Sequence, residues 1–173
     1  MSASGLDAPE VRVRRATPAD AAGVARVLNE AIADGRFTIL DLRFSAEDEA
    51  AYIAGLGPRG FINVAETADG DIVGAQTVAP LDDAAGSQDH VATMGTWVLA
   101  AWRRRGVGRA LFAAGAAAAR ELGYAKVFTD LRADNDASLA FHTSLGFTVV
   151  GRARRHVRIG GRDIDALLIE TEL

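Results

Sequence analysis

The central segment of the chain, residues 97–109, reads Trp97-Val98-Leu99-Ala100-Ala101-Trp102-Arg103-Arg104-Arg105-Gly106-Val107-Gly108-Arg109. It begins at the apolar end of a predicted strand and continues into a basic turn that contains two glycines. Residues 106–122 are rich in alanine and leucine and predict a helix, which Gly123 ends. An apolar run at 125–131 has the length of a buried strand. A strand, a helix and a strand in this order indicate a parallel crossover.

The segments on either side of this unit predict further strands and helices. Alternating apolar and charged residues indicate a strand at 11–14, and capping sequences at 17–20 and 45–48 start two helices that end near Gly35 and Leu56. The pair Asp69-Gly70 is a strong signal for a β-hairpin. The other predicted elements are strands at 61–65, 72–78, 90–99, 148–158 and 163–172 and a helix at 136–145. This order favours the α/β class, with a mixed sheet and helices on both faces.

Length and composition limit the possible functions. A chain of 173 residues fits one domain, which we place at residues 10–173 after a flexible tail at residues 1–9. The net charge of −4 gives no general attraction to nucleic acid or anionic lipid, and the absence of cysteine excludes disulfides and zinc-thiolate sites. No apolar run approaches the roughly 20 residues of a membrane span, and the first nine residues lack a secretory pattern. We therefore expect a cytoplasmic protein without a membrane or nucleic-acid partner.

The basic turn at 103–109 is a candidate phosphate site. The N–H groups at a helix N-terminus attract anions, and arginines beside them would oppose the helix dipole unless an anion binds. Glycines let a phosphate approach the main chain without a Cβ in the way. The alternative interpretation is a charged turn that keeps the helix start soluble. A dinucleotide motif would need a third glycine where Leu111 stands, and the lysine of a P-loop is missing.

Two motifs resemble a known family. Arg103-x-x-Gly106-x-Gly108 resembles the acetyl-CoA pyrophosphate loop of the GNAT N-acetyltransferase superfamily. The segment from Asn135 to Phe147, Asn-Asp-Ala-Ser-Leu-Ala-Phe-His-Thr-Ser-Leu-Gly-Phe, resembles that superfamily's second signature, with His142 in the tyrosine position as in the phosphinothricin acetyltransferase-like branch. The resemblance implies a GNAT fold of about seven mixed strands and four helices, acetyl-CoA as the cofactor, and a homodimer.

The resemblance also implies roles for particular residues. Trp97, Val98 and Leu99 would offer main-chain groups to the pantetheine arm, and Asn135, Ser138 and His142 would lie beside the cofactor. The pyrophosphate would be bound by Arg103, Arg104, Arg105, Gly106, Val107, Gly108 and Arg109. Each assignment has a structural alternative: Trp97 and Val98 as core residues, Asn135 as a helix cap, Ser138 as a first-turn residue and His142 as a packed side chain. For Asn135 the cap and the cofactor contact are compatible.

The implied chemistry is the direct attack of a neutral amine on the thioester in a ternary complex. A main-chain N–H at Val98 or Leu99 would hold the carbonyl oxygen. His142 would protonate the leaving sulfur, although free imidazole is mostly neutral at pH 7 and a thiol of pKa about 8.5 leaves tolerably without help. We therefore expect His142 and Val98 to be catalytic, with a modest contribution from His142.

The acceptor amine and the general base are less well defined. The branch places a glutamate where this chain has Thr93 and Met94, so Glu30, Asp89, His90 or a water chain are the possible bases. Glu30, Phe37 and Thr38 are the predicted substrate contacts, and no metal is expected because the histidines lack partners at ligand spacing. We expect a small primary amine, either an amino acid or a similar compound. The alternatives are a protein or polyamine acceptor, and a non-catalytic acyl-CoA-binding or regulatory module.

Overall fold

A computed structural model describes residues 11–82 and 86–173 of the chain. The strands are β1 (Val11–Arg15), β2 (Phe61–Thr67), β3 (Ile72–Pro80), β4 (Val91–Val98), β5 (Lys126–Arg132), β6 (Thr148–Ile159) and β7 (Arg162–Glu172). The helices are α1 (Ala21–Asp34), α2 (Ala46–Gly55), α3 (Val107–Glu121) and α4 (Asp136–Thr143). Three short 3-10 turns lie at Pro18–Asp20, Gly86–Gln88 and Ala100–Trp102. All predicted strands and helices are present, with ends displaced by one or two residues in most cases. The predicted tail at residues 1–9 lies outside the described residues.

The strands form one seven-stranded sheet in the order β1-β2-β3-β4-β5-β7-β6. Every neighbouring pair is antiparallel except β4 and β5, which the α3 crossover makes parallel. The predicted mixed α/β fold is therefore confirmed. In the part of the chain that the structure describes, no helix combines the length and the apolar composition that a bilayer crossing requires.

The two parallel strands are paired over only a short stretch. Val91 pairs with Lys126 and Ala92 with Val127, and no further pairs follow between β4 and β5. Further along, a side chain replaces the ladder: the hydroxyl of Thr129 donates to the carbonyl of Met94 at 3.1 Å. Beyond that contact the strands diverge, and a gap opens between the end of β4 and the end of β5.

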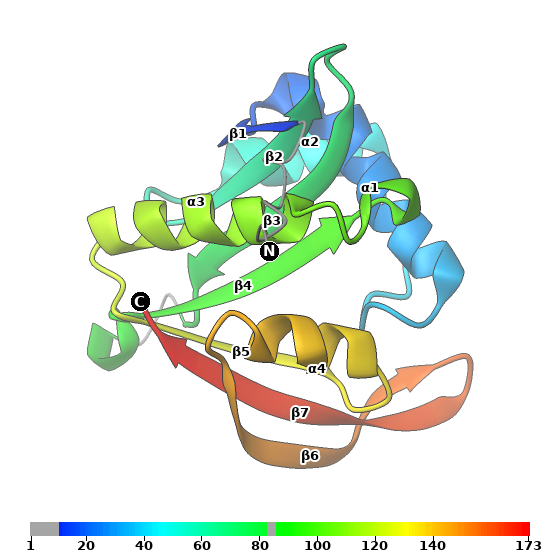
Figure 1. Cartoon of the computed structure of the whole chain (residues 1–173), viewed down its shortest axis with the longest axis vertical. Coiled ribbons are helices and arrows are strands. Elements are labelled where there is room, and N and C mark those ends of the chain that lie inside the picture. The colour runs from blue at the N-terminus through cyan, green and yellow to red at the C-terminus, as the bar shows by residue number, and fades with distance from the viewer. Residues whose placement is uncertain (1–10, 83–85) are drawn as a thin grey trace, which may run out of the picture.

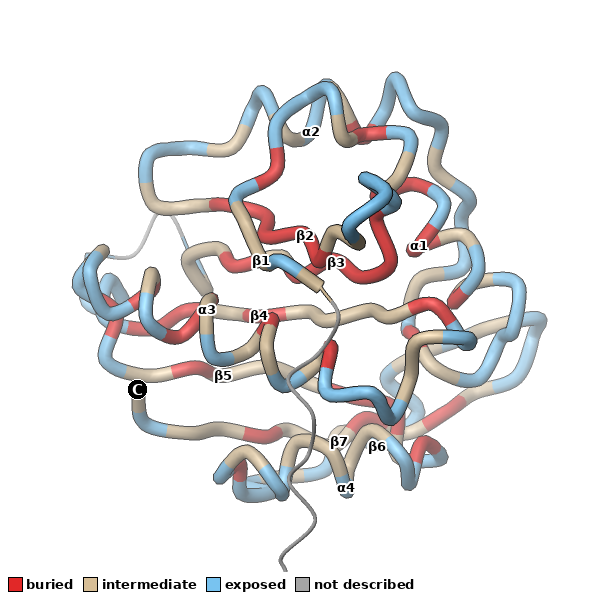
Figure 2. Tube along the Cα trace, turned by 45° about the horizontal axis from the view of Figure 1, so that its top comes forward, coloured by how far each residue is buried: buried red, intermediate tan, exposed pale blue. Residues whose placement is uncertain are grey.

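The helices form a layer on each side of the sheet. In Figure 1, α3 and α4 lie in front of the sheet while α1 and α2 lie behind it. Buried side chains from α1, β2 and β3 form one core cluster, and side chains from β5, β7 and the end of α3 form a second. Buried positions are concentrated in β2 and β3 (Figure 2), whereas β6 at the sheet edge has none. The diverging pair β4 and β5 is thus supported on both sides by packed layers.

Candidate active site

A cavity of about 490 Å³ lies at the gap between β4 and β5. Its walls come from both layers of helices, because α4 contributes Ser138 and His142 while α2 contributes Glu49 and Tyr52. The loop between α1 and α2 adds Phe37, Thr38, Ile39, Leu40 and Phe44, and the strands add Thr77, residues 93–97 and residues 129–132. A molecule bound on the α3–α4 side of the sheet can therefore meet one bound on the α1–α2 side.

The register of β4 decides which of its amides face the gap. Leu99 donates its N–H to Val73 at 3.0 Å, and the carbonyl of Val91 accepts from Leu81 at 3.1 Å. Antiparallel pairing alternates, so the odd-numbered residues of β4 bond to β3 and the even-numbered ones point toward β5. Of the two predicted carbonyl-oxygen donors, the N–H of Val98 faces the gap, whereas the N–H of Leu99 is used by the sheet. Neither side chain lines the cavity.

The first turn of α3 follows β4 after a tight loop. Gly106 adopts a left-handed conformation with φ of 81°, which favours glycine, and Arg104 also has a positive φ of 61°. Within the described residues, no side chain caps this helix. The N–H groups of its first turn, from Val107 onward, therefore remain available to an anion.

Gly108 has a packing role that the sequence does not reveal. A Cβ at this position would lie 3.1 Å from Cζ of Phe141 in α4. The glycine therefore lets the first turn of α3 pack against α4, in addition to any access it gives a phosphate. The contact joins the uncapped helix start to the helix that carries Ser138 and His142.

The predicted pyrophosphate-binding arginines have different environments. Arg103 donates its Nε to the carbonyl of Val98 at 3.1 Å, and its guanidinium lies 4.3 Å from the ring centre of Phe37. Its side chain thus supports the end of β4, which argues against a direct pyrophosphate contact. Arg105 stacks on Trp102 at 4.2 Å, and Arg109 donates to Ser144 at 3.1 Å. Arg104 is exposed at the left-handed position.

Asn135 at the start of α4 has one role that the structure shows directly. It is buried, lines the cavity and caps α4, since its Oδ1 accepts from the N–H of Ser138 at 3.0 Å. Its Nδ2 group has no hydrogen bond to the described residues. Asn135 can therefore cap α4 through Oδ1 and still donate a hydrogen bond to a ligand from Nδ2. The two predicted roles, helix cap and cofactor contact, are compatible in this geometry.

The hydrogen bonding of His142 corrects its predicted role as an acid. Its Nδ1 lies 2.8 Å from the carbonyl of Ser138, and a carbonyl only accepts, so Nδ1 carries the proton. Burial lowers the pKa of His142 below its usual value, while the bond to Ser138 opposes the shift. The neutral ring then presents an unprotonated Nε2, which accepts a proton or a hydrogen bond and does not donate one. The predicted protonation of sulfur by His142 does not fit this geometry.

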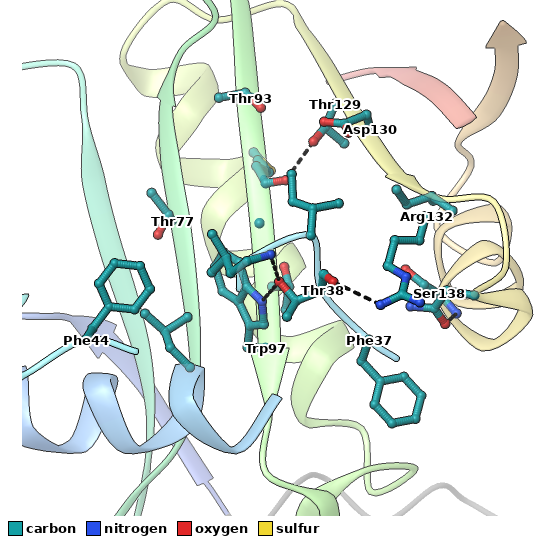
Figure 3. A pocket seen from close by; sticks show the side chains of 18 of the residues that line it. Phe37, Thr38, Phe44, Thr77, Thr93, Trp97, Thr129, Asp130, Arg132 and Ser138 are labelled. Atoms are coloured by element: carbon teal, nitrogen blue, oxygen red, sulfur yellow. Dashed lines mark hydrogen bonds between the residues drawn. The ribbon is translucent and has the colours of Figure 1, made fainter. Parts of the chain in front are cut away.

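The loop between α1 and α2 crosses the gap (Figure 3). The Thr38 hydroxyl accepts from Nε1 of Trp97 in β4 at 3.3 Å, and the Thr38 carbonyl accepts from Nη1 of Arg132 in β5 at 3.4 Å. Arg132 also donates from the same nitrogen to the carbonyl of Gly35. Phe37 and Thr38 thus line the cavity, their contact with the substrate stays a prediction, and Thr38 connects the loop to both diverging strands.

The bases suggested by the sequence lie elsewhere. Glu30 is exposed, and its carboxylate accepts from the N–H of Ala100 at 2.6 Å, so it anchors the turn after β4 and does not line the cavity. Asp89 and His90 are exposed at the opposite end of β4. Glu30 is therefore outside the lining of this cavity, and the structure gives its predicted substrate contact no support.

Glu49 is the cavity residue that the sequence analysis missed. It is only 4% exposed, and burial together with the nearby charge of Asp48 raises its pKa. The signal was present in the helix pattern, because Glu49 shares the inward face with Ile53 and Leu56 at i+4 and i+7. A charged residue on the buried face of a helix indicates a candidate functional residue. Asp48 in α2 and Asp130 in β5 are the other carboxylates in the lining.

Comparisons with known proteins agree with this geometry. The model of the acetyltransferase (GNAT) family matches residues 26–147. RimI of Mycobacterium tuberculosis, an N-alpha-acetyltransferase, is 37% identical over 98 residues, which are 54% of this chain and 56% of RimI. The chain thus spans about half the length of that relative.

Solved structures match over nearly the whole chain. The ribosomal-protein-alanine N-acetyltransferase of Brucella melitensis has a TM-score of 0.85 at 25% identity, covering 94% of this chain and 99% of its own. A phosphinothricin acetyltransferase of Sinorhizobium meliloti, solved in complex with acetyl-CoA, has a TM-score of 0.83 at 20% identity, covering 95% and 89%. At that identity the second match shows the fold alone.

Proposed function

Because the chain belongs to the acetyltransferase (GNAT) family, we propose that it is an N-acetyltransferase that transfers the acetyl group of acetyl-CoA to a primary amine. The observation that supports this most is the pairing of an uncapped helix start with a cavity that passes through the sheet. Two sites on opposite faces are what a ternary complex of thioester and amine requires.

The residues on the α3–α4 side fit the coenzyme. The amides from Val107 to Arg109 at the start of α3 would bind the pyrophosphate, with Arg104 and Arg109 as charged neighbours. Val98 presents its N–H to the gap, and Asn135 has a free Nδ2 donor on the α4 side. When bound, acetyl-CoA supplies the activated acetyl group as a thioester.

The described residues around the gap can position the thioester and accept the proton of the amine, but the neutral His142 does not supply a proton donor for the leaving sulfur. Val98 is placed to donate its N–H to the carbonyl oxygen of the acetyl group. The proton acceptors that line the cavity are the carboxylates of Asp48, Glu49 and Asp130 and Nε2 of His142, and the Asp48 carboxylate already accepts from Ser45. An amine with a pKa of about 10.4 must lose a proton before it attacks, so these acceptors, and not a proton donor, are what the reaction uses first.

A small-molecule amine is our first proposal for the acceptor. The cavity lies within the chain, where strands β3, β4 and β5, loop 36–44 and α2 supply most of its lining, and its volume suits a small ligand. A protein N-terminus is the second candidate, because RimI and the Brucella enzyme are named for such activity. The TM-scores of 0.85 and 0.83 do not separate that group from the phosphinothricin branch.

Binding and turnover test the proposal separately. Calorimetry with CoA and acetyl-CoA should show association, and a thiol assay with acetyl-CoA should show amine-dependent release of CoA. The panel should contain small alkyl amines, free amino acids and short peptides with a free N-terminus. A folded protein that binds neither CoA nor acetyl-CoA would overturn the assignment. Binding without turnover across the panel would instead support the non-catalytic module.

A further inference from the structure

Glu49 is a buried carboxylate without a protein partner. It is 4% exposed and lines the cavity from α2. None of the groups in the described ranges donates a hydrogen bond to its carboxylate, and the causes of its raised pKa are burial and the charge of Asp48 alone. Isolated burial of an ionised carboxylate is unfavourable, so such groups are normally paired.

The groups around Glu49 do not balance its charge. On its own helix, Asp48 is a like charge and Tyr52 is a neutral phenol whose pKa is raised by burial and by Glu49. From the elements packed against α2, α1 lines the cavity with Leu28 only, and Asp20 of the first 3-10 turn is held by Arg14 at 2.7 Å.

The far walls of the cavity provide no free cation either. β5 contributes Asp130, a further acid, and Arg132. The Nε and Nη2 of Arg132 both donate to Asp134 at 2.9 Å, and its Nη1 donates to the carbonyls of Gly35 and Thr38. Burial lowers the pKa of His142 in α4, which favours the neutral ring, and its Nδ1–H donates to the carbonyl of Ser138. Among the residues that line the described cavity, acids therefore outnumber available cations.

From this imbalance we infer that Glu49 is the counter-ion for the acceptor's ammonium group, and that the acceptor is a primary amine without a carboxylate beside its amino group. The inference rests on the proposed function and narrows it. A free amino acid would bring a carboxylate that needs a cation, but four of the five N–H donors of Arg132 are already used and its charge is shared with Asp134. The apolar walls formed by Leu40, Phe44 and Trp97 suit a hydrocarbon or aromatic body.

Matched pairs of acceptors test the substrate class. Phenethylamine and phenylalanine differ only in the carboxylate, as do 3-methylbutylamine and leucine. The amine of each pair should be acetylated with a kcat/KM at least tenfold higher than that of its amino acid. Equal or higher kcat/KM for the amino acids would overturn the inference.

Glu49→Gln tests the residue. The substitution keeps the shape and removes the charge, so kcat/KM for the preferred amine should fall about 10- to 100-fold, mainly through KM. The acid limb of the pH profile of kcat/KM should disappear with it. Glu49→Asp should restore part of the activity because it restores the charge. Glu47→Gln is the matched control, since Glu47 is exposed on the same helix and does not line the cavity.

The outcomes separate this inference from the proposed function. If Glu49→Gln binds acetyl-CoA with wild-type affinity but acetylates amines poorly, the ammonium site is supported. Wild-type kcat/KM and pH profile in Glu49→Gln would overturn the role of Glu49 while the acetyltransferase assignment stands. Loss of acetyl-CoA binding in the wild-type chain would overturn the proposed function itself.

Discussion

Glu49 and His142 are single residues whose surroundings set their charge. Folding leaves the Glu49 residue only 4% exposed, with no hydrogen-bond donor to its carboxylate among the described residues, so burial and the charge of Asp48 raise its pKa. Burial of His142 lowers its pKa, and its Nδ1 bond to Ser138 fixes the tautomer. Both side chains line the same cavity, and the protonation state of each affects either stability or turnover in a predictable direction.

Glu49→Gln should stabilise the fold at neutral pH. Since the pKa of Glu49 is raised on folding, the folded state binds its proton more tightly than the unfolded chain does. The free energy of unfolding therefore falls as the pH rises from about 4.3, the unfolded pKa, through the folded pKa, and it stays lower above that. Thermal unfolding at pH 7 should show a higher Tm for the variant, by about 2–4 °C per kcal/mol recovered.

The gain should vanish at low pH. At about pH 4 the carboxyl of Glu49 is largely protonated in both states, so wild type and Glu49→Gln should unfold at similar temperatures. Glu47→Gln should show little change at either pH. A lower Tm for Glu49→Gln at pH 7 would mean that the folded protein stabilises the ionised carboxylate of Glu49.

His142→Phe should reduce kcat only modestly. Because Nε2 is unprotonated and the pKa lies below its ordinary value, the residue supplies no proton to sulfur, and we expect a loss of less than about tenfold. Acetyl-CoA affinity should remain close to that of the wild type. A loss of a thousandfold, together with a kcat that requires a protonated group near pH 7, would restore the acid role.

At the scale of elements, the first turn of α3 is fixed by its contact with α4. Gly108 leaves room for Phe141, and Arg109 donates to Ser144 at the end of α4. The uncapped amides of α3 and the cavity wall formed by Ser138 and His142 therefore keep a set spacing. A change that separates the two helices affects the fold and the coenzyme site together.

Gly108→Val should weaken both stability and acetyl-CoA binding. The new Cβ would lie 3.1 Å from the Phe141 ring, and overpacking of this kind costs about 1–3 kcal/mol. Gly108→Ala should show the same two effects at smaller size. Calorimetry measures the affinity for acetyl-CoA, and thermal unfolding measures the stability. An unchanged Tm with a weakened affinity would show that the Phe141 ring moves aside without cost and that the substitution acts only by blocking the approach of the phosphate.

At the scale of the whole molecule, loop 36–44 holds the diverged strands at a fixed separation. Thr38 contacts Trp97 on β4 and Arg132 on β5, and Arg132 in turn bonds Asp134 beyond the end of β5. The sheet lacks ladder hydrogen bonds at this point, so these side-chain bonds replace them. The acceptor side of the cavity depends on this connection.

Arg132→Met should destabilise the fold and raise the KM for the amine while the Kd for acetyl-CoA changes little. Breaking a fully buried pair costs about 3–5 kcal/mol; because Asp134 is 39% exposed, we expect roughly 2 kcal/mol. Arg162→Met is the control, since Arg162 bonds the same aspartate from a 68% exposed position and should cost less than about 1 kcal/mol. Equal effects of the two variants on the KM would contradict the role of the loop.

The sequence predicted the elements well because period, caps and turn residues are local signals. The Asp69-Gly70 hairpin, the Gly35 and Gly123 helix ends and the crossover around α3 all lie where expected. Phe37 and Thr38 at the cavity come from the irregular loop that the sequence indicated as a substrate wall, and Ser138 and His142 come from the second motif.

Long-range contacts account for what the sequence did not predict. The bond between Glu30 and Ala100 joins residues 70 positions apart, and the packing of Phe141 on Gly108 depends on the angle between two helices. The side chain of Arg103 folds back toward β4 because the carbonyl of Val98, at the end of that strand, accepts a hydrogen bond from its Nε. Glu49 reaches the cavity only because α2 packs against α1.

The cavity walls come from separate stretches of chain: residues 28–52 supply most of the side facing α1 and α2, and residues 135–142 the side facing α4. Substitutions in the earlier stretch can therefore change which amine is accepted without disturbing the later one. A library of substitutions confined to positions 37–52 should yield proteins with altered acceptor preferences that still bind the coenzyme normally. The acceptor specificity of this fold can therefore be changed separately from its coenzyme binding.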